Sequence, residues 1–230
     1  MGLHFYFTAR DAKHLLFGLI LFEIFLVAIF VADTLLGQPK WTIHVLFDLD
    51  GEGNIPAWFS SVQLFLIGLV FFLKGRQSDP DYRPSSLFFS MVGAGFVFLS
   101  VDEAASIHEK ITHVLTPIAW VPRFKGDHGV WVFIYILVGV SLFFATYRDL
   151  MAMWKRYRSA TSILAVGMGL FLIGVIGLEI VSFEFLRSGS TPLLYQAEVA
   201  LEEFLEMSGE SIMLYGTLLL APQESGPRAS

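Results

Sequence analysis

Acidic side chains and a histidine recur at helical spacing within one apolar stretch of this chain. Asp102, Glu109 and His113 follow one another at intervals of seven and four residues. If the helix predicted over residues 86–105 continues to His113, these positions fall within an arc of about 60° at about 100° per residue, and we expect one polar stripe. Glu109 and His113 can then hold one ion between them, because side chains four residues apart are neighbours on a helix.

A second stretch places five carboxyl groups on one side of a predicted helix. Four of them step at intervals of four residues and the fifth lies at the edge of the same half: Glu198, Glu202, Glu206, Glu210 and Glu203. Unpaired carboxylates are unfavourable in an apolar segment, because even one charge at the centre of a bilayer costs at least about 2.5–3.5 kcal/mol. These acids must therefore be protonated, pair with His, Lys or Arg side chains, or bind a cation.

We predict a metal site with ligands from both stretches: Asp102, Glu109, His113, Glu202 and Glu206. Mixed imidazole and carboxylate ligands suit Zn, Mn or Fe, whereas an all-oxygen subset suits Ca or Mg. Glu179 and Asp102 are the candidate catalytic residues, and His108 and Glu198 are candidate additional ligands. A bound divalent ion would activate water or oxygen for attack on a lipid. The alternative is a purely structural hydrogen-bond network among the same side chains.

An acidic segment over residues 48–54 resembles the front half of an EF-hand calcium loop. Asp48, Asp50 and Glu52 stand at positions one, three and five, and Gly53 stands at position six. The match fails at position twelve, where Phe59 replaces the bidentate glutamate. Two other interpretations stay open, namely an Asp-Gly turn before a helix start, and a loop that covers the acidic site and lends it a ligand.

The composition indicates that these groups are positioned by helices in a membrane. Of 230 residues, 55% are apolar and 16% are charged, and the mean hydropathy is +0.64. A soluble domain carries roughly 25% charged residues and cannot bury so much apolar surface. The absence of cysteine excludes thiolate metal sites, and the net charge of −6 gives no reason to expect a nucleic-acid partner.

Six stretches are long and apolar enough to span a bilayer, which takes about 20 residues. They lie at about residues 15–36, 57–73, 86–105, 130–147, 162–185 and 197–220. The sequence therefore predicts an all-α, polytopic membrane protein, a six-transmembrane-helix bundle. We expect one domain over residues 1–222 and a short cytoplasmic tail over residues 223–230.

Basic residues give the expected direction of the spans. The segments on the side of both termini carry ten Lys and Arg residues, against five in the other set. This bias favours cytoplasmic termini in a plasma or inner membrane. Nearly all the acids in or beside the spans then lie in the outer half, with Glu23 as the exception near mid-span.

The fifth predicted span carries four glycines: Gly167, Gly169, Gly174 and Gly177. Small residues let helices approach closely in lipid, so we favour close packing here over a flexible hinge.

Two functions fit the pattern of acids. The first is a metal-dependent membrane enzyme, a hydrolase or an oxidoreductase, that acts on a lipid or another membrane substrate. The second is a cation or proton transporter or channel that uses the same acids as a vestibule, and a third interpretation is a non-catalytic accessory subunit. A permeation path needs polar groups at both depths of the membrane, so the one-sided distribution favours a site. The sequence leaves substrate, metal identity and oligomeric state open.

Overall fold

The computed structural model describes residues 8–79, 82–187 and 190–220, and these residues form helices and turns without a strand. The predicted tail over residues 223–230 lies outside the described residues. The elements are α1 (Ala9–Leu35), α2 (Trp41–Phe47), α3 (Ile55–Arg76), α4 (Ser86–Ala105), α5 (Ile107–Leu115), η1 (Lys125–Asp127), α6 (Val130–Arg156), α7 (Arg158–Leu172), η2 (Ile173–Leu178), α8 (Glu179–Val181), η3 (Ser182–Leu186) and α9 (Pro192–Leu218).

Five of the described helical segments are long and apolar enough to cross a membrane. They are α1, α3, α4, α6 and the continuous stretch Arg158–Leu186, which contains α7, η2, α8 and η3. The prediction of an all-helical protein is confirmed for the described residues, and five of its helical segments could span a membrane. The sixth span is not confirmed, because α9 carries five glutamates and is too polar to count as one by composition, although its 27 residues exceed the length that a bilayer requires.

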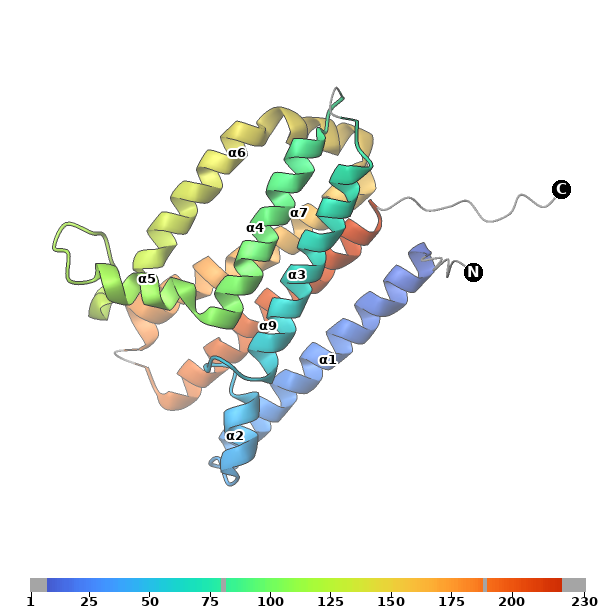
Figure 1. Ribbon diagram of the computed structural model, residues 1–230. Coiled ribbons are helices and arrows are strands. Elements are labelled where there is room, and N and C mark those ends of the chain that lie inside the picture. Colours follow the sequence, from blue (N-terminus) through green and yellow to red (C-terminus); the bar gives the residue numbers. More distant parts are fainter. Residues whose placement is uncertain (1–7, 80–81, 188–189, 221–230) are drawn as a thin grey trace.

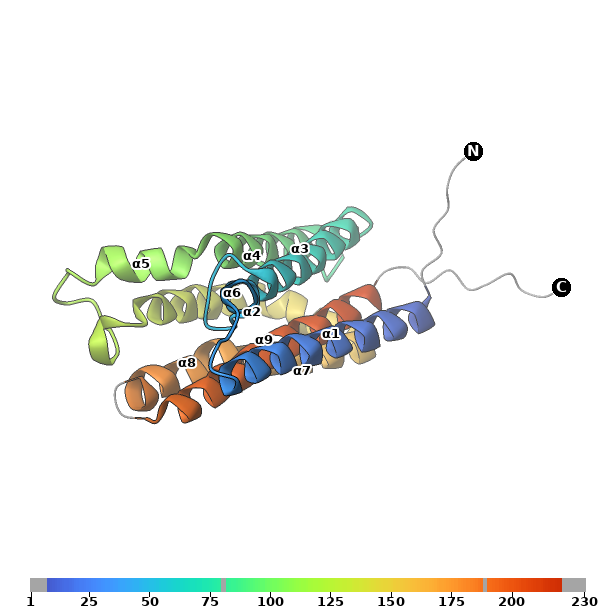
Figure 2. The same ribbon diagram turned by 90° about the horizontal axis from the view of Figure 1, so that it is seen from below.

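The helix α9 lies at the centre of the fold and contacts α1, α3 and α7 (Figure 1). Seen from below, α3 and α4 form one layer and α1, α7 and α9 form another (Figure 2). One buried apolar group includes Phe71, Phe89 and Met213 and joins α3, α4 and α9. A second includes Leu26 and Met207 and joins α1 to α9. The acidic helix is therefore enclosed by apolar ones rather than exposed at the edge of the bundle.

Glycines let α9 approach its neighbours closely. A Cβ atom on Gly167 would lie 2.7 Å from the carbonyl oxygen of Gly209, and one on Gly209 would lie 2.6 Å from the backbone nitrogen of Phe171. A Cβ atom on Gly174 would lie 2.6 Å from Cγ of Glu206. By contrast, Gly169 has no neighbour within 4 Å. Close packing is thus the role of Gly167 and Gly174, whereas Gly169 is not at a close contact.

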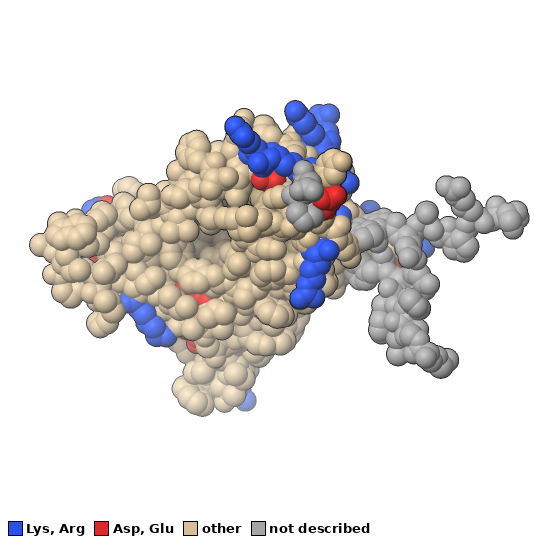
Figure 3. Space-filling model, turned by 45° about the horizontal axis from the view of Figure 1, so that its top comes forward, with Lys and Arg blue, Asp and Glu red and all other residues tan. Residues whose placement is uncertain are grey.

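Lys and Arg side chains gather at the end of the bundle where α3 turns into α4 and α6 turns into α7 (Figure 3). At this end, Arg83 forms an ion pair with the buried carboxylate of Asp149 on α6. The backbone N–H of Ser85 donates a second hydrogen bond to the same carboxylate, at 2.8 Å. The opposite end holds α2, α5, η3 and the start of α9, and it carries most of the candidate site residues (Figure 1).

The predicted continuation of the third helix to His113 is wrong. The helix α4 ends at Ala105, and Ser106 adopts a left-handed conformation with φ of 49°, from which α5 leaves in a new direction (Figure 1). This conformation costs a non-glycine residue about 1–3 kcal/mol. Hydrogen bonds to Asp102 offset the cost, because its backbone carbonyl accepts from the N–H of Ser106 and its carboxylate accepts from that of His108. The single polar stripe expected along this stretch therefore does not exist.

The middle of α6 stands apart from the other helices. Every residue from 136 to 145 is exposed, although ten residues make almost three helical turns and so point in all directions. The two ends of α6 are held instead: Trp131 is buried at one end, and Asp149 binds Arg83 at the other. Surrounding lipid can therefore reach every side of this apolar stretch.

Candidate metal centre

The imidazole of His108 is held in place by Asp102. The Oδ1 atom of this buried carboxylate accepts the backbone N–H of His108 at 2.7 Å and lies 3.3 Å from ring Nδ1. Both contacts cross the turn at Ser106, which connects the end of α4 to the start of α5. With Nδ1 engaged by the carboxylate, the other ring nitrogen, Nε2, is the one directed away from Asp102.

Three side chains from two parts of the chain converge around this second nitrogen. Glu52, His108 and Glu109 each offer one ligand atom, and these atoms lie within 4.8 Å of one another. The distance from Nε2 of His108 to Oε1 of Glu52 is 4.0 Å. The groups are half-buried or exposed, so the cluster is open on one side. One imidazole nitrogen and two carboxylates at this spacing can close around one divalent ion.

The segment 48–54 presents Glu52 to this cluster. The amide Nδ2 of Asn54 donates to the carbonyl oxygens of Asp48 and Gly51, each at 2.6 Å, and Oδ1 of Asn54 accepts the N–H of Ala57 at the start of α3. One buried side chain thus fixes the loop and caps the helix after it. This geometry agrees with the interpretation of a loop that lends the site a ligand.

The three carboxylates of the same loop face three different partners, so the loop geometry does not favour the EF-hand interpretation, which stays a prediction. Asp48 lies 3.8 Å from Nε2 of His44, and Asp50 accepts a hydrogen bond from the hydroxyl of Tyr195 at 2.8 Å. Glu52 faces His108 instead. Side chains that diverge in this way do not enclose one calcium ion.

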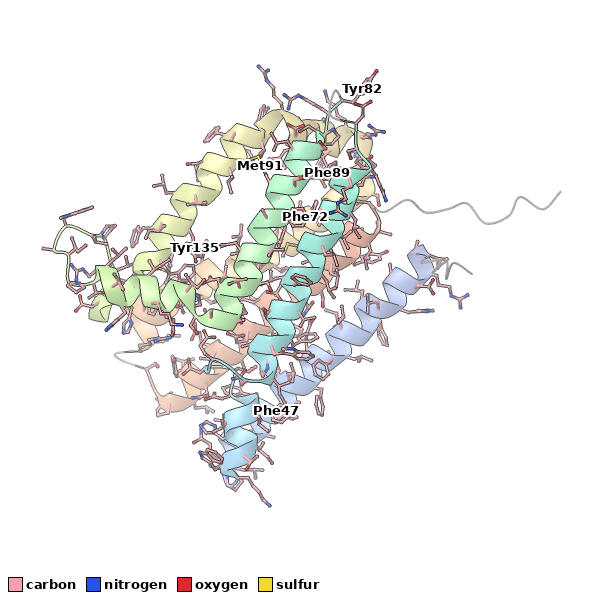
Figure 4. All side chains as sticks on the ribbon, viewed as in Figure 1. Phe47, Phe72, Tyr82, Phe89, Met91 and Tyr135 are labelled. Carbon is pink, nitrogen blue, oxygen red and sulfur yellow. The ribbon has the colours of Figure 1, made fainter. Side chains whose placement is uncertain are left out.

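Aromatic side chains of α6 and α4 form one wall of the site. The ring of His108 meets that of Trp131 edge to face, with centroids 5.2 Å apart. The ring centroids of Trp131 and Tyr135 lie 5.3 Å apart. The ring of Tyr135 (Figure 4) has its centroid 6.0 Å from that of Phe98 on α4. These aromatic rings therefore connect His108, one of the candidate metal ligands, to the apolar, exposed stretch of α6.

A second acidic group lies between α8 and α9. The carboxyl groups of Glu179 and Glu202 are within interaction distance of each other, and Arg187 is a cation that acts on Glu179. Glu198 is buried with 7% of its surface exposed, and both of its carboxyl oxygens lack a hydrogen-bond partner among the described residues. This group lies close enough to the one around His108 for Glu179 to feel the charge of its imidazole.

Two further glutamates of α9 lie between these groups. Glu203 is half-buried and is placed where it interacts with Glu103 on α4 and with Glu52 in the loop. Glu206 is also half-buried and packs against Gly174. Glu203 is thus the α9 carboxyl that faces the cluster of His108, rather than Glu202 or Glu206.

A third polar group lies in the middle of the bundle, where α1, α3 and α9 meet. Glu23 and Glu210 are fully buried there. The hydroxyl of Ser211 contacts carboxyl Oε1 of Glu23 and, at 2.7 Å, Oε1 of Gln63, while the hydroxyl of Ser60 donates to Glu210 at 2.7 Å. Glu23, the acid expected near mid-span apart from the others, therefore belongs to the same buried group as Glu210, the last glutamate of α9.

The electrostatics of the loop and α5 follow from burial and from the density of acids. Burial raises the pKa of Glu52 despite the nearby charge of His108, and burial also raises the pKa of Asp50 despite its hydrogen bond from Tyr195. For His108, burial lowers the pKa, but the hydrogen bond and charge of Asp102, with the charge of Glu52, outweigh it. The net pKa of His108 is raised above its ordinary value, so the imidazole binds a proton readily.

The predicted ligand set is divided among these groups. Glu109 lies in the convergent cluster, and Asp102 lies behind it and orients His108. His113 is exposed and stands outside the cluster, and Glu202 and Glu206 lie on other parts of α9. Sequence spacing alone missed the pairing of Glu52 with His108, because residues so far apart are brought together only by the turn at residue 106 and by the loop.

Comparison with known proteins gives one match. A family model described as a domain of unknown function (DUF8692) matches residues 18–221, which cover all the groups described above. No curated protein and no solved structure matches the chain.

Proposed function

The chain belongs to the DUF8692 family. The description of this family names no function, so we propose one from the geometry of the site. The protein binds a divalent transition-metal ion through Glu52, His108 and Glu109, at the end of a membrane-embedded helical bundle, and uses it to activate water against a membrane lipid. The observation that carries the proposal is the convergence of these three ligand atoms within 4.8 Å.

The donor set and its support fit a catalytic metal. Metal-binding histidines usually give their second ring nitrogen to a carboxylate, which fixes the orientation of the ring, and Asp102 occupies that position behind His108. One nitrogen and two carboxylate oxygens favour Zn, Mn or Fe over Ca. Three protein ligands also leave a coordination position open, as in catalytic rather than structural sites.

The chemistry of the surrounding side chains supports a role in hydrolysis. A bound divalent ion would supply a water molecule that loses its proton near neutral pH. Glu103 and Glu203 are the additional carboxyls placed to accept that proton, because both interact with the Glu52 side of the cluster. Trp131 covers one face of His108 and limits access of bulk water from that direction.

The position of the site favours a lipid as substrate. The exposed apolar stretch of α6 over residues 136–145 leads to Tyr135 and Trp131. The ring of Trp131 contacts that of His108, and the ring of Tyr135 contacts that of Trp131. A lipid whose acyl chain lies along α6 would bring its polar part to the level of the cluster. A metal site at this depth, open toward lipid, is suited to an ester or amide bond near the headgroup.

The distribution of polar side chains also favours a site over a permeation path. The acids of α9 begin at Glu198 and end at Glu210, and the last two turns of the helix bury Met213 and Leu214 instead. A channel or transporter needs polar groups to continue to the basic end of the bundle, where Lys and Arg gather (Figure 3).

Metal analysis of protein purified into lipid nanodiscs tests the first half of the proposal. After equilibration with Zn, Mn, Fe or Ca and removal of free ions, we expect the wild type to retain about one transition-metal ion per chain. His108→Ala and Glu52→Ala should lose it, whereas His113→Ala, which changes an exposed histidine on the same helix, should retain it. Metal-free wild type, or loss of metal in H113A but not in H108A, would contradict this ligand set.

Lipid analysis tests the second half. Nanodiscs with a defined mixture of glycerophospholipids and sphingolipids are incubated with metal-loaded protein, and cleavage products are measured by mass spectrometry. We expect products with the wild type and with Glu184→Gln, whose half-buried carboxylate pairs with Lys125 at 3.1 Å, and none with His108→Ala or after chelation. A metal-loaded wild type that cleaves no lipid would leave the metal site standing and reject the catalytic role.

A further inference from the structure

We propose that Glu23 and Glu210 form a proton-binding pair in the middle of the bundle, in which both carboxyl groups carry a proton in the resting protein. This site is distinct from the metal cluster and shares no residue with it. It does not depend on whether the protein binds a metal or cleaves a lipid.

The first argument is burial without a counter-charge. Glu23 and Glu210 both have 0% of their surface exposed. No ion pair joins either of them to Lys, Arg or His within the part of the chain that the structure describes. An isolated carboxylate in such surroundings is strongly unfavourable, whereas the neutral acid avoids most of that cost.

The second argument is a count of hydrogen atoms. The hydroxyl of Ser211 lies in hydrogen-bond contact with carboxyl Oε1 of Glu23 and with amide Oε1 of Gln63. One hydroxyl carries one hydrogen and cannot donate to two acceptor oxygens. With the amide of Gln63 oriented as it stands in the structure, both contacts are satisfied if the carboxyl of Glu23 donates to Ser211 and Ser211 donates to Gln63, and this arrangement places a proton on Glu23.

The third argument comes from buried polar atoms without partners in the same group. They are Oε2 of Glu23, Oε2 of Glu210 and Nε2 of Gln63, whose side chain is 1% exposed. Ser60 donates to the other oxygen of Glu210 and satisfies only one of its two oxygens. An unsatisfied oxygen costs much less on a neutral acid than on a carboxylate, so the incomplete hydrogen bonding of Glu210 also favours a bound proton.

The acidic groups around Glu210 also favour a bound proton on its carboxyl. The titratable groups that interact with Glu210 are Glu103 on α4, Glu23 on α1 and Glu203 and Glu206 on α9, and all of them are acids. Repulsion among these groups disfavours ionisation of any one. Since Glu206 and Glu210 are one turn apart on α9, the row of acids offers this pair a route for proton exchange toward the metal end of the bundle.

Infrared spectroscopy of the protein in nanodiscs at neutral pH tests the proposal directly, because the carbonyl stretch of a protonated carboxyl is distinct from the bands of a carboxylate. Subtracting the spectrum of Glu23→Gln, or of Glu210→Gln, from that of the wild type should reveal a protonated-carboxyl band. Glu184→Gln is the control, because this acid forms an ion pair with Lys125 and should contribute carboxylate bands only.

A second variant keeps the test decisive if these substitutions disturb folding. Ser211→Ala leaves both acids in place and removes the hydroxyl that accepts the hydrogen bond from the carboxyl of Glu23, so the protonated-carboxyl band should shift. Loss of carboxylate bands in either glutamine variant overturns the proposal and indicates ionised groups, such as those that bind a metal cation. An unshifted band in Ser211→Ala overturns the hydrogen-bond arrangement assigned to Glu23.

Discussion

Asp102 accepts a hydrogen bond from the backbone N–H of His108, six residues later, at a distance of 2.7 Å. The same carboxylate oxygen lies 3.3 Å from the ring nitrogen of His108. A single side chain therefore stabilises the turn between α4 and α5 and sets the direction of the imidazole. The local fold and the candidate chemistry depend on one residue, and this dependence leads to the first prediction.

Replacing Asp102 with Asn should weaken metal binding without changing the ligands. The amide keeps an acceptor oxygen for the turn but removes the negative charge behind the imidazole. Loss of such supporting contacts typically costs about 10–100-fold in metal affinity. A competition titration against a chromogenic chelator gives the dissociation constant. An affinity equal to that of the wild type would show that Asp102 serves the turn alone.

The conformation of Ser106 predicts opposite effects for two substitutions. Its φ of 49° is left-handed, which glycine adopts at no steric cost and β-branched residues adopt poorly. Ser106→Gly should therefore raise the midpoint of thermal unfolding, and Ser106→Val should lower stability by about 1–3 kcal/mol. Thermal denaturation in one detergent measures both. A destabilised glycine variant would contradict the view that the serine is strained here.

Close packing of α7 against α9 predicts that Gly209→Ala is destabilising. The added Cβ would lie 2.6 Å from a backbone nitrogen and 2.7 Å from a backbone oxygen, and neither can move without separating the two helices. Overpacking of this kind costs about 1–3 kcal/mol. Gly169→Ala is the matched control, since that position has no neighbour within 4 Å, and it should gain about 0.5–1 kcal/mol from helix propensity. Equal effects of the two variants on the unfolding midpoint would contradict this packing.

Metal binding should weaken as the pH falls. Burial raises the pKa of Glu52, and in His108 the acids around the ring outweigh burial and raise its pKa above 6.5. Both groups hold protons to higher pH than usual, and a metal must displace those protons. Competition should therefore begin at a higher pH than with an unperturbed glutamate and histidine, and binding should release protons in calorimetry with buffers of different ionisation enthalpy. A dissociation constant that is unchanged down to pH 5 would contradict these ligands.

Much of the candidate site could be anticipated from residue types. The acids of α9 were recognised from their spacing of four, and this spacing holds because α9 is an unbroken helix. Glu52 was identified in an acidic loop, although for a calcium motif whose side chains in fact diverge. The polar stripe through Asp102 and His113 failed because it assumed helical geometry across Ser106.

The sequence alone determined that this protein is helical and apolar enough for a membrane, because hydropathy and helical periodicity act over short stretches of chain. It also determined that many acids would need protons, cations or partners. Only the tertiary structure decided which side chains the acids meet: Glu52 in the loop before α3 meets His108 on α5, and Glu23 on α1 meets Ser211 on α9. Such contacts depend on one left-handed residue, on glycine pairs between helices and on loop geometry, and none of these has a periodic signal in the sequence.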